Sequence, residues 1–270
     1  MIGIFDSGVG GLTVLKPIME LLPKYDYVYL GDNSRAPYGN KNKEAIINFS
    51  EQAINYLFDQ GVVLIIFACN TASSVALRPL QKKYLSGKDE TDRKILGVLR
   101  PVVEKAAQGK HDKIIGIVGT KATVNSKSYE KEITHLDPKI KIVSKACPLL
   151  VPFIEEGWHN KPEAISILKK YLRQLKSFHI NELILGCTHY PFMHKHFQRI
   201  MGNKVEILES GEITAKSLQD YLERHPEIES KLIKNKKRTF LTTGDPDEFQ
   251  KFIQKYIGTR IKKPLQIDLE

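Results

Sequence analysis

Short apolar runs recur along the chain, and each one is followed by a polar turn and then by a longer segment. We identify these runs at residues 2–5, 27–30, 62–67, 95–99, 114–118, 140–146, 182–186, 205–208 and 240–245. Runs that are apolar throughout, rather than alternating, are typical of strands buried on both faces of a parallel sheet. The pattern therefore predicts strands that alternate with helices along most of the chain.

The segments between these runs carry apolar residues at helical spacing. They predict helices at residues 12–22, 43–59, 126–136 and 162–177, and further helices that end near residue 85, begin at Pro101, include residues 194–196 and follow residue 211. Residues 86–93 are polar and charged without apolar periodicity, and we interpret them as a surface connection and a candidate domain boundary. The alternation predicts an α/β fold of two similar domains, each a largely parallel sheet flanked by helices.

The strongest candidates for chemistry are two cysteines that each end an apolar run. Cys187 lies in Gly-Cys-Thr-His at residues 186–189, and Cys69 lies in Ala-Cys-Asn-Thr at residues 68–71. Ligands normally bind where the carboxyl ends of parallel strands open into loops, and a neighbouring imidazole such as that of His189 favours a reactive thiolate. The repeated pattern predicts one thiol on each side of a cleft between the domains. The alternative is a small buried cysteine beside a structural histidine.

Two other strand ends carry long polar loops. Residues 6–11, Asp-Ser-Gly-Val-Gly-Gly, differ from a dinucleotide fingerprint because Thr13 stands where the third glycine is needed, and they lack the Gly-Lys-Ser/Thr ending of a P-loop. We expect these glycines to let the backbone approach a small ligand, a tight structural turn being the alternative. Residues 31–39 form a second loop of the type that often carries function.

The third thiol and the nearby charged residues favour structural interpretations. Cys147 precedes a proline and lacks the Cys-Thr-His setting, so we expect it to be structural. Glu155 and Glu156 fall in a predicted turn region, where such pairs are usually surface charges. The cysteine and histidines at residues 187, 189, 194 and 196 lack the ligand spacing of a zinc site, and we expect no metal.

Composition limits the classes of protein that remain. A length of 270 residues with 41% hydrophobic content allows one large α/β unit or two small domains. The three cysteines form no CxxC pair, which argues against a disulfide framework and predicts a reducing, cytoplasmic location. We expect no signal peptide and no membrane-spanning segment. The net charge of +10 is mostly dispersed and accompanies no nucleic-acid motif, so we expect no nucleic-acid partner.

The motifs together resemble those of the cofactor-independent aspartate/glutamate racemase family, in particular its bacterial glutamate racemases. The resemblance covers nearly the whole chain and rests on Asp-Ser-Gly-Val-Gly-Gly-Leu-Thr at residues 6–13, Pro-Tyr-Gly at 37–39, Ala-Cys-Asn-Thr-Ala at 68–72, Gly-Thr at 119–120, residues 152–157, and Gly-Cys-Thr-His-Tyr-Pro at 186–191. It implies that the carboxyl-terminal segment completes the first domain. The expected domains are therefore residues 1–93 plus 210–270, and residues 94–209.

The resemblance also implies an activity and a set of roles. The family interconverts L-glutamate and D-glutamate, supplies D-glutamate for peptidoglycan, uses neither pyridoxal phosphate nor another cofactor, and often forms homodimers. The implied catalytic residues are the two thiols and three assisting groups: Cys69, Cys187, Asp6, Glu155 and His189. The implied substrate-binding residues are Asp6, Ser7, Tyr38, Gly39, Asn70, Thr71, Thr188 and His189. Two positions depart from the family pattern: residues 99–102 lack the small residue often found after Pro101, and Glu209 stands where Asp is frequent.

Inversion at an α-carbon explains why two thiols would be needed. A proton must leave one face and another must arrive at the opposite face, which one ionised and one protonated thiol can achieve. A related racemase acting on aspartate or another amino acid is the nearest alternative. A cysteine hydrolase needs only one thiol and leaves the setting of Cys69 unexplained. A basic nucleic-acid-binding protein would instead show salt-dependent DNA binding that survives loss of both thiols.

Overall fold

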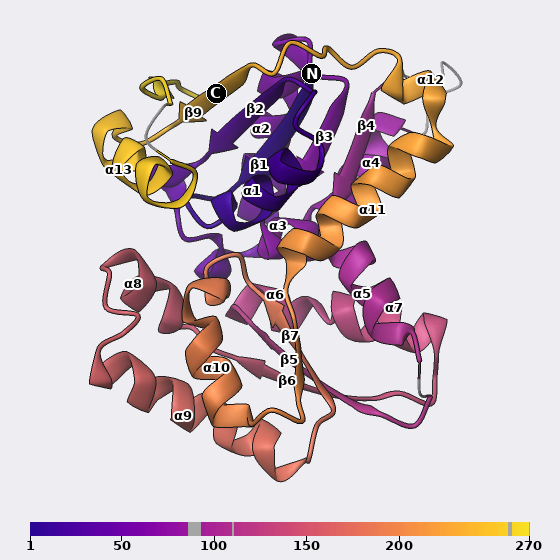
Figure 1. Cartoon of the computed structure of the whole chain (residues 1–270), viewed down its shortest axis with the longest axis vertical. Coiled ribbons are helices and arrows are strands. Elements are labelled where there is room, and N and C mark those ends of the chain that lie inside the picture. Colours follow the sequence, from indigo (N-terminus) through magenta and orange to yellow (C-terminus); the bar gives the residue numbers. More distant parts are fainter. Residues whose placement is uncertain (86–92, 110, 259–260, 270) are drawn as a thin grey trace.

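The computed structural model in Figure 1 describes residues 1–85, 93–109, 111–258 and 261–269, and it confirms the α/β prediction. Two sheets are present, and all their strand pairs are parallel. Within the described ranges, no helix combines the length and the apolar character needed to cross a membrane. We call the six-stranded sheet the first sheet and the four-stranded sheet the second sheet.

The first sheet lies in the upper part of Figure 1 and is built from both ends of the chain. Its strands, in spatial order, are β10 (Leu265–Gln266), β9 (Arg238–Thr242), β2 (Tyr27–Gly31), β1 (Ile2–Asp6), β3 (Leu64–Phe67) and β4 (Lys94–Gly97). The central strands β1, β2 and β3 are buried throughout, as their continuous apolar runs predict. The pattern does not predict β10, because it has only two residues and both are exposed.

Helices cover both faces of the first sheet. One face packs against α1 (Leu12–Leu21), α11 (Ser210–Arg224), α12 (Pro226–Glu229) and α13 (Pro246–Tyr256). The other face packs against α2 (Lys43–Asp59), α3 (Asn70–Val75) and α4 (Leu77–Leu85). The loop after β2 contains two short 3-10 helices, η1 (Asn33–Arg35) and η2 (Tyr38–Asn40). The apolar residues that face the sheet on both sides form two separate cores.

The second sheet has the strand order β6 (Lys141–Ala146), β5 (Ile114–Gly119), β7 (Glu182–Gly186) and β8 (Glu206–Leu208). One face packs against α8 (Leu150–Glu155), α9 (Pro162–Ser177), η3 (Tyr190–Met193) and α10 (His194–Met201). The other face packs against α5 (Leu99–Ala107) and α7 (Ser128–Leu136). The short helix α6 (Lys121–Ser126) follows β5 and leads into α7.

Two predicted segments differ from the structure. The helix expected at residues 126–136 is α7, which begins at Ser128 because Lys127 has a positive φ of 53°, and the short helix α6 before it was not expected. Residues 152–157, expected as a turn region, mostly belong to helix α8, because Leu150, Val151 and Ile154 bury one side of it. Proline at position 152 is tolerated since it lies in the first turn, where its missing N–H has no helical acceptor.

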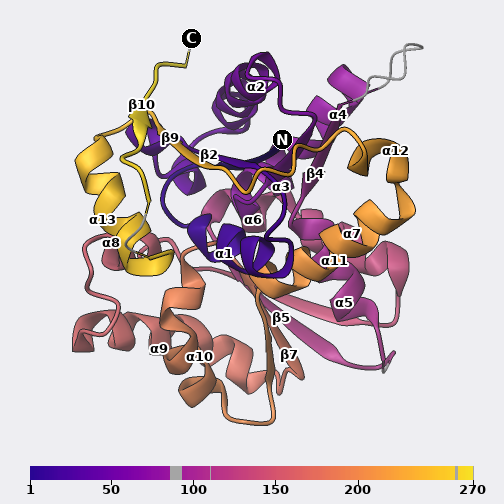
Figure 2. The same ribbon diagram turned by 45° about the horizontal axis from the view of Figure 1, so that its top comes forward.

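The chain passes between the two sheets twice, through α5 and again at the start of α11. Strand β4 pairs with β3 in the first sheet, although the expected boundary placed residue 94 in the second domain. Of the connection expected at residues 86–93, residues 86–92 lie outside the described residues, and the division into domains stays a prediction. Helix α11 contacts both α1 on the first sheet and α5 on the second, and Figure 2 shows it along their junction.

Candidate active site

In each sheet the strand order reverses beside the strand that comes first in the sequence, and ligands bind at such points in open parallel sheets. In the first sheet, the chain goes from β1 outward to β2 and then returns to β3 on the other side of β1. In the second sheet, it goes from β5 to β6 and returns to β7 on the other side of β5. The registers align the carboxyl ends of these strands, so four loops after β1, β3, β5 and β7 meet at the junction of the sheets.

The four loops and their neighbours enclose one small pocket. It is lined by Ser7, Ala36, Pro37, Tyr38, Gly39, Cys69, Asn70, Thr71, Thr120, Val151, Glu155, Cys187, Thr188 and His189. The structure thus brings together every site residue expected from the sequence except Asp6, which is fully buried behind the lining. Ala36, Pro37, Thr120 and Val151 were not expected there. The signal for Thr120 is its Gly-Thr setting at the end of β5, the same type of position that the cysteines occupy.

Cys69 is held at the start of α3 as its N-terminal capping residue. Its sulfur accepts a hydrogen bond from the backbone N–H of Ala72 at 3.4 Å and lies 3.3 Å from Oγ of Ser7. Burial raises the pKa of the Cys69 thiol to about 12, and the nearby carboxylate of Asp6 adds to the rise. Cys69 is therefore protonated at neutral pH, the state that a proton donor requires.

Cys187 lies beside a histidine that is held in the charged form. Nδ1 of His189 lies 3.9 Å from the sulfur of Cys187, and Nε2 lies 3.1 Å from Oε1 of Glu155. Burial lowers the pKa of His189, but the hydrogen bonds to Cys187 and Glu155 outweigh burial and raise this pKa to about 10. The resulting imidazolium places a positive charge beside the sulfur of Cys187. The two thiols are thus in opposite electrostatic environments, one beside a carboxylate and one beside a cation.

Asp6 links the two sides of the pocket from behind. Burial raises its pKa to about 6, against the opposing effects of the His189 charge and of the N–H groups of Gly11 and Gly8. The N–H of Gly8 donates to Oδ2 at 3.0 Å, and Oγ1 of Thr188 donates to Oδ1 at 3.4 Å. The carboxyl group of Asp6 therefore contacts two loops: the one after β1, to which it belongs, and the one after β7.

Hydroxyl groups form part of the remaining wall of the pocket, beside Ala36, Pro37 and Val151. Oγ1 of Thr71 lies 2.9 Å from Oγ1 of Thr120, which joins the loops after β3 and β5. The hydroxyl of Tyr38 donates to the buried carboxylate of Asp32, so this hydroxyl is already engaged within the loop after β2. These contacts leave a polar, uncharged wall that suits the carboxylate groups of a small substrate.

Two glycines allow the loops of the two sheets to approach closely. A Cβ atom on Gly10 would lie 2.3 Å from Oγ1 of Thr188 and 2.6 Å from Nδ1 of His189. A Cβ atom on Gly39 would lie 2.5 Å from Cβ of Thr120. All three distances are shorter than real Cβ contacts, so a side chain at either position would push the two sides of the pocket apart.

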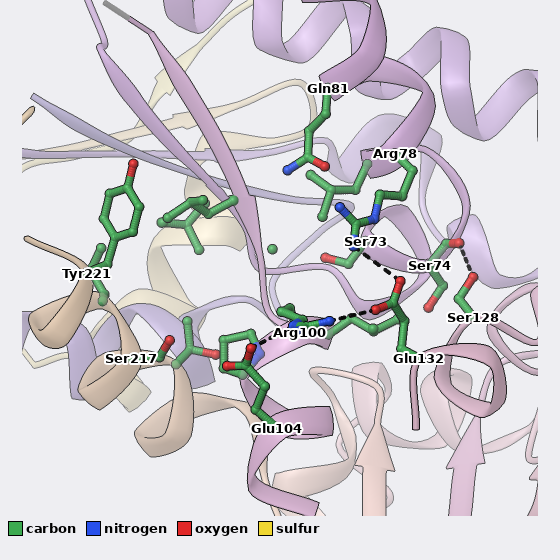
Figure 3. Close-up of a pocket in the computed structure, with 18 of the residues that line it drawn as sticks. Ser73, Ser74, Arg78, Gln81, Arg100, Glu104, Ser128, Glu132, Ser217 and Tyr221 are labelled. Carbon is green, nitrogen blue, oxygen red and sulfur yellow. Dashed lines mark hydrogen bonds and ion pairs between the residues drawn. The ribbon is translucent and has the colours of Figure 1, made fainter. Parts of the chain in front are cut away.

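The pocket is almost closed in this conformation. Its volume of about 20 Å³ is enough for one water molecule and too small for an amino acid. A substrate of that size therefore enters only when the loops separate. A larger cavity of about 610 Å³ lies elsewhere along the junction, between α4, α5, α7 and α11, and we call it the rear cavity (Figure 3). It is lined by no cysteine or histidine, so its size does not mark it as the catalytic site.

The positions that depart from the family pattern lie away from the thiols. Val102, the residue after Pro101, is fully buried in the core between the second sheet and helices α5 and α7. Arg100, in the same segment, lines the rear cavity, where it pairs with Glu104 at 2.6 Å and with Glu132 at 3.0 Å (Figure 3). Glu209 accepts a hydrogen bond from Nδ1 of His194 at the start of α11. Neither contact reaches the pocket that holds Cys69 and Cys187.

The remaining candidates from the sequence have structural surroundings. Cys147 is fully buried in the core between the second sheet and α8 and α9. His196 bonds to Asn160 at 2.8 Å, and it does not line the pocket that contains His189. Among the residues that the structure describes, no three His, Cys, Asp or Glu side chains are grouped as a metal site requires.

Two parallel sheets that bring a thiol each to one buried pocket define an α/β enzyme with a paired-cysteine site. The model of the Asp/Glu/hydantoin racemase family matches residues 10–218, and the chain belongs to this family. A glutamate racemase from Thermoanaerobacter sp. (strain X514) is 41% identical over 273 residues, covering 100% of this chain and 97% of that protein.

Solved structures of glutamate racemases are similar over the whole chain. An isoform from Bacillus anthracis is 34% identical with a TM-score of 0.90, covering 100% of this chain and 97% of that one. A glutamate racemase from Francisella tularensis, solved in complex with D-glutamate, is 32% identical with a TM-score of 0.88, again covering 100% and 97%. The arrangement of both sheets is thus that of the family.

Proposed function

We propose that this protein is a glutamate racemase that interconverts L-glutamate and D-glutamate by proton transfer between the substrate Cα and two thiols. The observation that carries the proposal is that Cys69, from the first sheet, and Cys187, from the second, line the same buried pocket. The glutamate racemases that are similar over the full length of the chain support glutamate as the substrate.

The mechanism uses the unequal environments of the two thiols. The thiolate of Cys187, stabilised by the imidazolium of His189, removes the α-proton from one enantiomer. Cys69, protonated because of burial and the charge of Asp6, donates its proton to the opposite face. The product leaves with the two protonation states exchanged, and the reverse reaction starts from that state.

The other lining residues bind the substrate and stabilise the charge that develops on it. Ser7, Asn70, Thr71 and Thr188 line the pocket with hydroxyl and amide groups. Donors that already point at the reacting group stabilise a carbanion-like transition state without having to reorganise. Closure of the loops of the two sheets around the substrate excludes water, and the exclusion of water strengthens these interactions. Tyr38 and Gly39 complete the wall on the side of the first sheet.

No cofactor has a role in this mechanism. Pyridoxal phosphate requires a lysine for its Schiff base, and no lysine is among the described residues that line the pocket. The two thiols and the polar lining perform the proton transfer and the charge stabilisation that such a cofactor would otherwise supply.

The biological setting follows from the family resemblance. We infer that the enzyme supplies D-glutamate for peptidoglycan synthesis in the cytoplasm and that it acts as a homodimer. We also infer two domains, with the second close to residues 94–209 and the first completed by residues 210–270, and we assign β4 to the first domain because it pairs with β3. Light scattering of the purified protein tests the dimer.

Circular dichroism of purified protein with L-glutamate, without added cofactor, tests the proposed function. We expect the optical signal of L-glutamate to decay to zero as the racemic mixture forms, and D-glutamate to give the mirror-image decay. A parallel reaction with L-aspartate measures substrate preference. No decay with glutamate, or faster turnover of aspartate than of glutamate, would contradict the proposal.

A further inference from the structure

The side-chain amide of Asn70 is hydrogen-bonded through its oxygen, whereas its nitrogen is unpaired among the described residues. Its Oδ1 accepts a hydrogen bond from the hydroxyl of Tyr129 at 2.6 Å and another from the hydroxyl of Ser210 at 3.3 Å. Its Nδ2 is buried and has no hydrogen-bond partner among the residues that the structure describes, and Asn70 lines the pocket with the thiols. An unpaired buried N–H donor is unfavourable, so this amide is suited to a ligand that accepts a hydrogen bond.

The two hydroxyls that hold Asn70 come from other parts of the fold. Asn70 begins α3 beside the first sheet, whereas Tyr129 lies on α7 in the core of the second sheet. Ser210 is the first residue of α11, where the chain returns to the first sheet. Both hydroxyl-bearing residues are buried, with exposed fractions of 1% for Tyr129 and 4% for Ser210. The orientation of the Asn70 side chain therefore depends on contacts across the junction of the sheets.

Helix α7 is attached to the segment that carries Asn70 by further contacts. Oγ of Ser128 donates to the backbone carbonyl of Ser74 at 2.6 Å, and Arg78 pairs with Glu132 at 3.2 Å. Figure 3 shows these two contacts side by side at the wall of the rear cavity. These contacts join α7 to α3 and α4, and the hydroxyl of Tyr129 extends from α7 to Asn70.

We propose that Tyr129 and Ser210 are positioning residues that orient the Asn70 amide, so that its NH2 group donates to a carboxylate of glutamate. This inference rests on the proposed function. Two hydroxyl donors on Oδ1 favour the orientation with Nδ2 towards the pocket. The flipped amide would present its oxygen to the substrate carboxylate, where two acceptors repel each other.

Kinetics of Tyr129→Phe test the inference, because this change removes the hydroxyl and keeps the ring. One lost hydrogen bond corresponds to a rise in KM for both enantiomers of roughly three- to tenfold. We expect kcat to change by less than about twofold, since binding lost equally in the ground and transition states raises KM alone. Tyr27→Phe is the matched control. This variant also loses a buried hydroxyl, which in the parental protein donates to the carbonyl of Leu22 at 2.8 Å. The KM of this variant should stay at the parental value.

A double-mutant cycle separates positioning from a general structural role. In an Asn70→Ala background, Tyr129→Phe should raise KM no further, because the amide it orients is gone. Ser210→Ala should also raise KM. If Tyr129→Phe does not fold, the KM of Ser210→Ala tests the inference in its place. An unchanged KM in the folded hydroxyl variants, or a full additional effect in the Asn70→Ala background, would overturn the inference. An inactive parental enzyme would instead refute the proposed function.

Discussion

Oε1 of Glu155 lies 3.1 Å from Nε2 of His189, and the other ring nitrogen of this histidine faces the thiol of Cys187. Glu155 ends helix α8 and His189 follows strand β7, so the packing of α8 on the second sheet places a carboxylate behind the imidazole. The imidazolium is favoured by both neighbours. The contribution of His189 to folding is present below its unfolded pKa of about 6.5 and is lost as the pH rises through about 10.

Glu155→Gln should lower the pKa of His189, because the amide keeps a hydrogen-bonding oxygen but removes the negative charge. We expect the alkaline limb of the pH profile of kcat/KM to move to lower pH, with the largest loss of activity between about pH 8 and 10, below the pKa of about 10. Glu156→Gln is the matched control, since the neighbouring carboxylate is exposed. An alkaline limb that stays in place in Glu155→Gln would show that this carboxylate does not act through His189.

Removal of either active-site thiol should abolish racemisation. We expect Cys69→Ala and Cys187→Ala each to lower kcat by at least about 10³-fold, because each deletes a group that transfers a proton. Cys147→Ala should retain most of the activity, since Cys147 lies in the core of the second sheet. Circular dichroism at far-ultraviolet wavelengths checks that all three variants are folded. Parental rates in a folded Cys69→Ala or Cys187→Ala protein would rule out the two-thiol mechanism.

The fate of the α-hydrogen distinguishes two opposed thiols from a single base. In deuterated water, the donating thiol carries deuterium, so early product should contain solvent deuterium at Cα. Unconverted substrate should keep much of its original hydrogen, because the abstracted hydrogen returns to the same face before the substrate leaves. Mass spectrometry of both enantiomers at low conversion, starting from each one, measures this. Early product that retains the original hydrogen in either direction would count against transfer from opposite faces by Cys69 and Cys187.

Asp6→Asn should stabilise the fold while it impairs catalysis. The pKa of Asp6 is raised from 3.8 to about 6, so its ionisation disfavours the folded state by up to about 3 kcal/mol above pH 6, and this effect disappears below the unfolded value. We expect the variant to gain roughly 1–3 kcal/mol in the free energy of unfolding at pH 8, a gain that shrinks towards zero near pH 4. Urea unfolding at both pH values measures it. An equal gain at both would exclude ionisation as the cause.

Gly10→Ala should block closure of the pocket without unfolding either sheet, because the added Cβ would meet Thr188 and His189. We expect kcat/KM to fall by at least about 10²-fold, as a displacement of about 1 Å at a catalytic group does. Gly8→Ala lies in the same loop, and its Cβ would have no contact shorter than 3.5 Å. Comparable kcat/KM in the two variants would show that close approach at Gly10 is not needed.

The apolar runs predicted the strands well because the central strands are buried on both faces, so their sequence reports burial directly. The ends of elements were less predictable: β4 stops at Gly97 and α5 already begins at Leu99, although the apolar run continues to residue 99. The pattern could not predict the break at Lys127, since nothing in the residue type requires its positive φ. Tertiary packing, rather than local sequence, determines where these helices and strands begin and end.

The two cysteines were predictable as a site because each ends a strand, and the ends of parallel strands meet. The contact between Glu155 and His189 could not be predicted from the spacing of residues in the sequence. From local sequence Glu155 is a surface charge like Glu156, yet the packing of α8 brings its side chain to His189. The resemblance to a family pointed to its role, while the roles of Tyr129 and Ser210 required the hydrogen bonds that cross the junction.

The pairing of β2 with β9 has a consequence for synthesis on the ribosome. Tyr27 pairs with Arg238, so the outer edge of β2 stays uncovered until residues 238–242 have emerged. All strands of the second sheet, in contrast, have emerged once residue 208 is free. Because domains begin to fold during translation, the nascent protein can complete the later sheet before the earlier one. Until then, the exposed edge of β2 is where a nascent chain is open to mispairing with another, so residues 238–242 protect strands that were made more than 200 residues earlier.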